Sequence, residues 1–110
     1  MQDSAYRFDV IQFLDPSGHL QQPLPESLNS RVKLIQLYQT MVFTRLFDQA
    51  AINLQRTGAM GTYASVEGQE AIGTGIGYAM HQSDVLVPYY RDIATQIQRA
   101  VLPEEILRYW

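Results

Sequence analysis

The longest regular pattern of apolar positions lies in the first half of the chain. From Glu26 or Ser27 onward, apolar residues recur every three or four positions, which is the spacing of one face of a helix. This face consists of Leu28, Val32, Ile35, Tyr38 or Gln39, Val42, Leu46, Ala50 and Leu54. Ser27 or Ser30 is a suitable N-cap, while Arg56 and Gly58 supply a cation and a C′ glycine. The pattern therefore predicts a helix of roughly 28–30 residues that ends near Gly58.

Apolar residues also lie outside this face. They widen the apolar stripe past half of the helix circumference, and they are Leu34, Leu37, Met41 and Phe43. A helix of this kind is covered on more than one side. Since a chain of 110 residues can hardly bury both sides, we infer that part of the helix contacts another subunit and expect the chain to homodimerise. The alternative is a core helix with one exposed hydrophobic patch.

Residues 1–26 are predicted to form an N-terminal arm. Residues 8–14 have the composition of a short strand, and Asp15-Pro16-Ser17-Gly18 is typical of a turn. A return strand beginning at His19 would complete a small hairpin, which Pro23 and Pro25 then stop. Because an isolated two-stranded ribbon is marginally stable, this arm is expected to lie against its own domain or a partner.

A glycine-rich stretch follows the long helix. Ser65 can cap a second helix in which Glu67 and Glu70 occupy the first turns. Small residues at four-residue spacing predict a smooth face for close approach of another backbone, and they are Ala71, Gly75 and Ala79. Residues 73–77 do not match a nucleotide-binding loop, because no strand precedes them and their glycine spacing differs from the dinucleotide fingerprint.

The last third of the chain combines a short apolar run with candidate ligand-binding residues. Residues 85–87 predict a strand, buried on both faces if the sheet is parallel, with Pro88 at its end. Such a strand would deliver Tyr90 and Arg91 to the carboxyl edge of a sheet, where open α/β folds bind ligands. The planar fork of arginine matches carboxylate or phosphate oxygens, so the expected ligand is an anion.

Two short helices are predicted after this strand, one from Ile93 and one from Pro103, with Glu104 and Glu105 at the start of the second. The apolar pattern is still running at Trp110, so we expect the sequence to be a piece of a longer protein. The fold class is α/β, although most of this piece is helical.

Composition narrows the function classes. The net charge is −3 with no basic stripe, which argues against nucleic acid as a partner. The absence of cysteine excludes disulfides and thiolate metal sites and fits a reducing compartment. No apolar run approaches the ~20 residues of a membrane span, and no secretory signal is recognisable. A cytoplasmic location without membrane contact is expected.

Several segments, in their order and spacing, resemble a known family. They are residues 37–42 with Arg45, residues 55–58, Gly68-Gln69-Glu70-Ala71, residues 84–86 and Tyr90-Arg91-Asp92. Together they are similar to the N-terminal quarter to third of the α subunit of thiamine-diphosphate-dependent 2-oxo acid dehydrogenases, of which the pyruvate and branched-chain enzymes are the nearest. The resemblance implies that residues 27–110 form the first part of a thiamine-diphosphate-binding domain, in which helices flank a parallel sheet.

The resemblance also implies roles for individual residues. Tyr90 and Arg91 are expected to hydrogen-bond the diphosphate of thiamine diphosphate, whereas Gly68-Gln69-Glu70 is expected to serve packing and capping. The loop with Tyr63 and Ser65 resembles the segment that lines the entrance for the 2-oxo acid. Thr62 and Ala64 stand where some pyruvate-specific relatives carry an aromatic residue and a histidine. Both pyruvate and a branched-chain 2-oxo acid therefore remain open as substrates.

The implied reaction is oxidative decarboxylation of a 2-oxo acid with acyl transfer to lipoamide. The resemblance implies a β subunit that completes a heterotetramer and a lipoyl-bearing acyltransferase as partners. The Mg²⁺ ligands and the catalytic residues are expected beyond residue 110, so these 110 residues alone are predicted to be inactive and to bind the cofactor weakly. Alternatives are an acetoin dehydrogenase α subunit, a transketolase relative, and a non-catalytic helical interaction module.

Overall fold

The computed structural model describes residues 9–110, which divide after Ser30 into two compact units. Within this range the regular structure is helical, and the only β-pairing is an isolated antiparallel bridge between Leu14 and Leu20. No helix in residues 9–110 is long and apolar enough to cross a membrane. Residue 8, the predicted start of the first strand, lies outside the described residues.

The first unit is built around a tight turn. The backbone amide of Gly18 donates a 3.0 Å hydrogen bond to the carbonyl oxygen of Asp15, and Gly18 has φ +83°, a conformation that favours glycine. Oδ1 of Asp15 accepts hydrogen bonds from the amides of Ser17 and His19 at 2.8 and 2.9 Å. The turn and the bridge lie where the sequence predicts a small hairpin, and a 3-10 helix, η1 (Glu26–Leu28), follows them.

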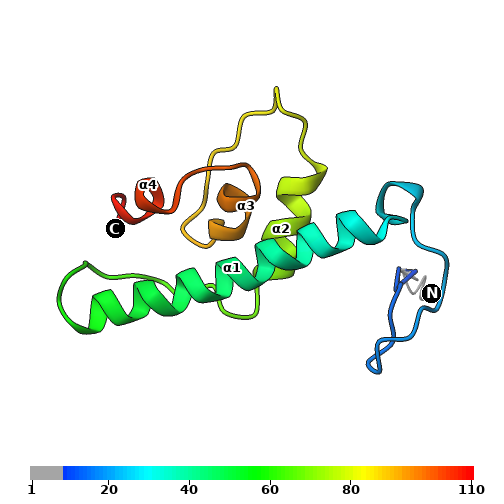
Figure 1. Ribbon diagram of the computed structural model, residues 1–110, viewed down its shortest axis with the longest axis horizontal. Coiled ribbons are helices and arrows are strands. Elements are labelled where there is room, and N and C mark those ends of the chain that lie inside the picture. The colour runs from blue at the N-terminus through cyan, green and yellow to red at the C-terminus, as the bar shows by residue number, and fades with distance from the viewer. Residues whose placement is uncertain (1–8) are drawn as a thin grey trace, which may run out of the picture. The chain divides into compact units, whose positions relative to one another are not determined.

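The second unit is organised along helix α1 (Arg31–Arg56), which Figure 1 shows running the length of this unit beside α2 and α3. Its 26 residues contain no glycine or proline and correspond to a length of about 39 Å. The helix ends in a Schellman motif. The amide of Ala59 donates to the carbonyl of Leu54, the amide of Gly58 donates to that of Gln55, and Gly58 has φ +74°. The predicted end of the helix is thus confirmed.

The buried face of α1 is not the apolar face that the sequence pattern indicates. Its buried residues are Thr44, Phe47, Asp48 and Ala51. The predicted face is exposed instead, by between 37% and 66% at Val32, Ile35, Tyr38, Val42, Leu46 and Leu54. Counting apolar residues misses the packed face because two of its members are polar and satisfied by hydrogen bonds, as described below for Asp48.

Helices α2 (Glu70–Ala79) and α3 (Ile93–Gln98) pack closely through two glycines of α2. A Cβ atom at Gly73 would lie 2.7 Å from Cβ of Ala94, and one at Gly77 would lie 2.8 Å from Cβ of Gln98. The Thr95 hydroxyl donates a 3.0 Å hydrogen bond to the carbonyl oxygen of Gly73, which locks this contact. The predicted close approach of another backbone to α2 is therefore confirmed, with α3 as the neighbouring helix.

The residues that make this approach differ from the predicted ones, however. Ala71, Gly75 and Ala79 are exposed, and a Cβ atom at Gly75 would meet nothing within 4 Å. The predicted capping of α2 by Ser65 is also wrong. The helix begins after Gln69, because Gly68 with φ +87° turns the chain between Ser65 and Glu70.

The prediction of a strand at residues 85–87 is also wrong for this structure. These residues form part of an extended connection between α2 and α3 that pairs with no strand in residues 9–110. Val85 and Val87 are each 86% exposed, so the expected buried strand is absent from this structure. The physical reason is that a strand is stabilised by its neighbours, and this stretch has none.

The start of this connection is tied to the end of α3. The guanidinium of Arg99 donates hydrogen bonds to the carbonyl oxygens of His81 and Asp84 at 3.0 and 2.8 Å. In Figure 1 the connection rises as a long arch above the helices.

Helix α4 (Pro103–Leu107) completes the second unit, with Pro103 at its first turn as predicted. Oε2 of Glu105 accepts a 3.2 Å hydrogen bond from the amide of Leu102 and so satisfies one free donor at the helix start. The core lies between α1, α3, α4 and the loop after α1, and it consists of Phe47, Ala51, Tyr63, Val66, Ile93 and Ile106.

Candidate functional site

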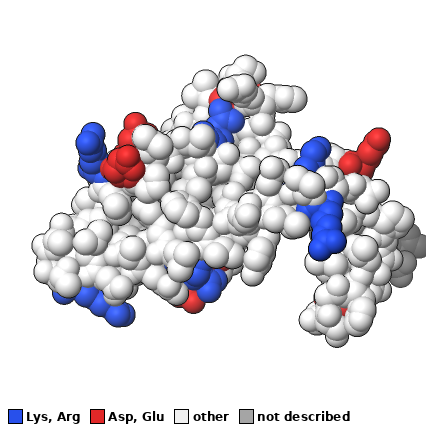
Figure 2. Space-filling model, in the orientation of Figure 1, with Lys and Arg blue, Asp and Glu red and all other residues white. Residues whose placement is uncertain are grey.

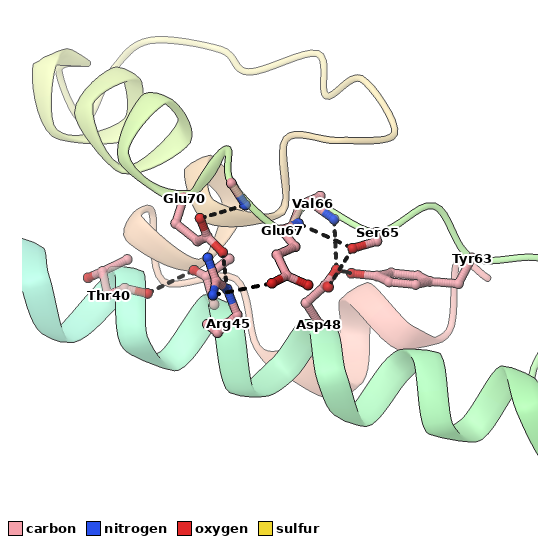
Figure 3. Close-up of polar contacts among 10 residues, drawn as sticks. Thr40, Arg45, Asp48, Tyr63, Ser65, Val66, Glu67 and Glu70 are labelled. Carbon is pink, nitrogen blue, oxygen red and sulfur yellow. Dashed lines mark hydrogen bonds and ion pairs between the residues drawn. The ribbon is translucent and has the colours of Figure 1, made fainter.

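A buried carboxylate organises the loop between α1 and α2. Asp48, only 2% exposed, lies on the inner face of α1. Its Oδ1 accepts hydrogen bonds from the Tyr63 hydroxyl at 2.8 Å and from the Val66 amide at 2.7 Å, and its Oδ2 accepts one from the Ser65 hydroxyl at 2.7 Å. Figure 3 shows these three groups converging on Asp48 from the loop. The charge is thus compensated by three donors, as a buried carboxylate requires.

Tyr63 is a structural side chain in this arrangement. It is 4% exposed, and its ring meets that of Trp110 edge to face at a centroid distance of 5.1 Å. Burial, and after it the hydrogen bond to Asp48, raises the pKa of the Tyr63 hydroxyl well above its ordinary value. The phenol therefore remains protonated and keeps donating to Asp48 at neutral pH.

A second carboxylate fixes the start of α2. Glu70 is 5% exposed, and its Oε1 accepts a hydrogen bond from Nε of Arg45 on α1, as Figure 3 shows. Its Oε2 accepts a 3.0 Å bond from the amide of Gly68, and Nη1 of Arg45 also lies 3.5 Å from Glu67. Hydrogen bonding to Arg45 is the main cause of the lowered pKa of Glu70. The Gly68-Gln69-Glu70 segment thus serves packing and capping of the backbone.

The predicted anion-binding residues lie on a turn directly before α3. Oδ2 of Asp92 accepts a 2.7 Å hydrogen bond from the amide of Tyr89, and the Asp92 amide donates to the Tyr89 carbonyl at 2.9 Å. These two bonds close the turn that carries Tyr90 and Arg91. The guanidinium carbon of Arg91 lies 5.4 Å from the ring centroid of Tyr90, so the two side chains are adjacent.

Tyr90 is 43% exposed and its ring lies against that of Tyr89, with ring centroids 3.9 Å apart and ring planes tilted by 49°. Hydrogen bonding with the Tyr89 hydroxyl, and then with Arg91, lowers the pKa of the Tyr90 hydroxyl below its ordinary value. The Tyr90 hydroxyl thus lies among polar groups that favour its ionised form.

Arg91 connects this turn to the loop after α1. Its Nη1 donates a hydrogen bond to the carbonyl oxygen of Ser65, whose hydroxyl is bound to Asp48. Arg91 has no ion-pair partner in residues 9–110. Because a guanidinium carries five N–H donors, and the Ser65 carbonyl and the Tyr90 hydroxyl take only some of them, donors remain for an anionic ligand.

A hollow of about 410 Å³ opens beside Tyr90, between the turn and helices α3 and α4. Ile93, Ile106 and Trp110 contribute apolar walls, and Glu105 is its one charged lining residue. Arg91 does not line it. The hollow therefore suits an apolar group better than an anion.

The four predicted site residues fall into two groups. Arg91 and Ser65 are brought together by a direct hydrogen bond, and Tyr63 and Ser65 share Asp48 as an acceptor. Tyr90 lies beside Arg91 and forms no hydrogen bond with Tyr63 or Ser65. Sequence reasoning missed Asp48, although one signal was present: an acidic residue on an otherwise apolar stretch of helix must be exposed or fully paired.

Residues 9–110 contain no group of three or more His, Asp or Glu side chains that could hold a metal ion. The donors gathered around Arg91 fit an anionic group.

Comparison with known proteins assigns the second unit to a family. Residues 38–110 match the family model described as dehydrogenase E1 component. The pyruvate dehydrogenase E1 component subunit alpha of Staphylococcus aureus is 36% identical over 94 residues, which are 84% of this chain and 25% of the relative. The subunit of the same name from Staphylococcus epidermidis is 35% identical over 94 residues with the same coverage. The chain thus spans about a quarter of the length of these curated relatives. No solved structure matches the chain.

Proposed function

The chain belongs to the dehydrogenase E1 component family, as an N-terminal part of an E1 α subunit, and from this premise we propose that it contributes to a diphosphate site for thiamine diphosphate. The carrying observation is the turn at Tyr90 and Arg91, whose donors are close together and have no carboxylate partner in residues 9–110. A guanidinium and a phenol are both suited to donating hydrogen bonds to phosphate oxygens.

In the complete enzyme the reaction is oxidative decarboxylation of a 2-oxo acid with acyl transfer to lipoamide. The cofactor supplies the electron sink for this decarboxylation. Tyr90 and Arg91 bind and orient the diphosphate by donating hydrogen bonds, and the Asp92 turn holds both at the start of α3. Mg²⁺ and the acid–base groups are supplied by residues outside this stretch. The isolated chain is therefore inactive and binds the cofactor weakly.

The loop containing Tyr63 and Ser65 lines the entrance for the 2-oxo acid in this proposal. Because both side chains are bonded to Asp48, they contribute by fixing the course of the loop. Names of the relatives favour pyruvate as substrate. A branched-chain 2-oxo acid remains an alternative because Thr62 and Ala64 lack the bulk of an aromatic residue and a histidine.

The exposed connection between α2 and α3 indicates how the chain is completed. Val85 and Val87 are apolar and exposed, and their extended backbone has no pairing partner in residues 9–110. We expect residues 85–87 to become a strand of a parallel sheet when neighbouring strands are present. A β subunit and a lipoyl-bearing acyltransferase are the proposed partners. The absence of cysteine suits a reducing compartment, and the proposed location is the cytoplasm.

The deciding experiment uses the enzyme that carries this sequence, assembled with its β subunit. Activity is measured on pyruvate, branched-chain 2-oxo acids and acetoin, for the wild type and for Arg91→Met. Removing one charge-assisted donor, which is worth about 1.5–3 kcal/mol, should raise the cofactor concentration for half-maximal activity about 10- to 150-fold. Arg108→Met, at an exposed residue, is the matched control. An unchanged cofactor requirement in Arg91→Met would refute the proposed contact, and activity on acetoin alone would identify an acetoin dehydrogenase instead.

For the chain alone, calorimetric titration with thiamine diphosphate and Mg²⁺ should give no micromolar binding. A micromolar dissociation constant would contradict the view that the site needs further residues.

A helical interaction module is the second candidate, favoured by the exposed apolar face of α1. Tyr38, Val42 and Leu46 are 63%, 40% and 59% exposed. In Figure 2 the surface over α1 is largely uncharged. This face leads us to propose that the chain homodimerises. Analytical ultracentrifugation should show a dimer that Leu46→Glu weakens, while a monomer at all concentrations would count against both ideas.

A further inference from the structure

We propose that Asp48 is a positioning residue for Arg91 and acts through the peptide bond between Ser65 and Val66. This inference rests on the proposed diphosphate function of Arg91. It assigns a role to a side chain that touches neither the ligand site nor Arg91 itself.

The link is a single planar unit. The Val66 N–H donates a 2.7 Å hydrogen bond to Oδ1 of Asp48, and the Ser65 carbonyl oxygen accepts a hydrogen bond from Nη1 of Arg91. These two groups belong to the same peptide bond. In a trans peptide unit the N–H and the C=O are held in one plane and point in opposite directions. Fixing the N–H on Asp48 therefore fixes the direction in which the carbonyl meets the guanidinium.

The rest of the Asp48 environment makes this anchor rigid. Asp48 is 2% exposed, and its Oδ2 holds the Ser65 hydroxyl at 2.7 Å, so the residue that offers the carbonyl is tied down at both its side chain and its peptide. The Val66 side chain is 1% exposed and packed in the core. Rotation of this peptide would break a buried charge-assisted bond, which is unfavourable.

The two charged groups that bind the peptide between Ser65 and Val66 also reinforce each other electrostatically. A carboxylate binds the N–H side of the peptide and a guanidinium binds its C=O side, so each charge polarises the peptide in the direction that strengthens the other bond. Without Asp48 the carbonyl loses both its orientation and this polarisation, and the Arg91 side chain loses its fixed acceptor.

The test follows Arg91 directly by NMR in the full chain without ligand. The readouts are the heteronuclear NOE of Arg91 Nε–Hε, which reports side-chain order, and the amide proton shift of Val66. Asp48→Ala should lower the Arg91 NOE toward that of a mobile arginine. Phe47→Leu, at the adjacent buried position of α1, is the control for general destabilisation and should leave it unchanged. A folded Asp48→Ala protein with an unchanged Arg91 NOE would overturn the proposal.

Asp48→Asn decides the matter if Asp48→Ala does not fold. The amide oxygen of the asparagine can still accept a hydrogen bond from Val66 but carries no charge, so the Val66 amide proton signal should shift upfield. The Arg91 NOE should decrease as well, but it should stay above the value of a mobile arginine. A shifted Val66 signal with an unchanged Arg91 NOE would again overturn the proposal.

Titration with inorganic pyrophosphate separates this inference from the proposed function. In the wild type the Arg91 Nε–Hε signal should move, and Asp48→Ala, or Asp48→Asn in its place, should need about five to ten times more pyrophosphate for the same shift. A wild-type signal that does not respond even at pyrophosphate concentrations high enough to detect weak binding would refute the diphosphate function. The variant NOE values would still decide whether Asp48 orders Arg91.

Discussion

Arg45 and Glu70, which are 25 positions apart in the sequence, form an ion pair that joins the middle of α1 to the first residue of α2. The Glu70 side chain is 7% exposed, whereas that of Arg45 is 40% exposed. The pair thus has one buried and one accessible partner. Removing the accessible partner leaves a buried carboxylate without its cation.

Arg45→Met should therefore lower the urea concentration at the unfolding midpoint. The effect should be several times larger than that of Arg108→Met, which removes an exposed cation that forms no ion pair within residues 9–110. Chemical denaturation at pH 7, followed by circular dichroism, measures both. Equal midpoints for the two variants would mean that the pair contributes nothing to stability.

The same pair predicts how stability changes in acid. The pKa of Glu70 is lowered below its ordinary value of 4.5, so the folded chain holds the ionised form more strongly than the unfolded chain does. The resulting stabilisation is complete above pH 4.5 and is lost as the pH falls through the lowered pKa. Glu70→Gln should flatten the stability profile below this pH. A profile identical in slope to the wild type would contradict the assignment to Glu70.

The raised pKa of Tyr63 predicts that stability is lost at high pH, the opposite direction to the effect of Glu70. The Tyr63 pKa is raised above the ordinary value of 10.0, so its stabilisation is complete below pH 10.0 and is lost at higher pH as the unfolded chain ionises. In a spectrophotometric titration of the seven tyrosines, one should ionise only when the chain unfolds. Tyr63→Phe should remove this late step and cost about 1 kcal/mol of stability at neutral pH. A late step that persists in Tyr63→Phe would assign it to another tyrosine.

Two glycines of α2 form a matched pair for testing the packing against α3. Gly73→Ala would place a Cβ atom 2.7 Å from Cβ of Ala94 and should destabilise the fold. Gly75→Ala meets nothing within 4 Å and should stabilise the helix by about 0.5–1 kcal/mol. Thermal unfolding of both variants distinguishes the two faces. If Gly75→Ala were the harmful change, the predicted smooth face would be the packed one.

The sequence predicted local features well where a single residue carries the signal. The end of α1 at Gly58 and the start of α4 at Pro103 follow from the backbone preferences of glycine and proline. The segments that carry the family resemblance include Arg45 and Glu70, and the structure explains their co-occurrence by pairing them.

Which faces are buried could not be predicted in the same way. Thr44 and Asp48 are buried because hydrogen bonds satisfy them, and the donors to Asp48 lie 15 to 18 positions away, on a loop that periodicity does not describe. The glycine contacts of α2 likewise depend on where α3 lies. The roles of Tyr90 and Arg91 remain predictions, because they rest on a ligand.

The connection between α2 and α3 is held by hydrogen bonds at both ends, whereas Val85 and Val87 in its middle are exposed. The Arg99 guanidinium donates hydrogen bonds to backbone carbonyls at the start of the connection, and Asp92 accepts a hydrogen bond from the Tyr89 amide at its end. A neighbouring strand would therefore pair with the exposed backbone of this span without displacing the hydrogen bonds at its two ends. In the proposed assembly, folding of the helical unit and pairing of this span with a partner strand would then be separable events.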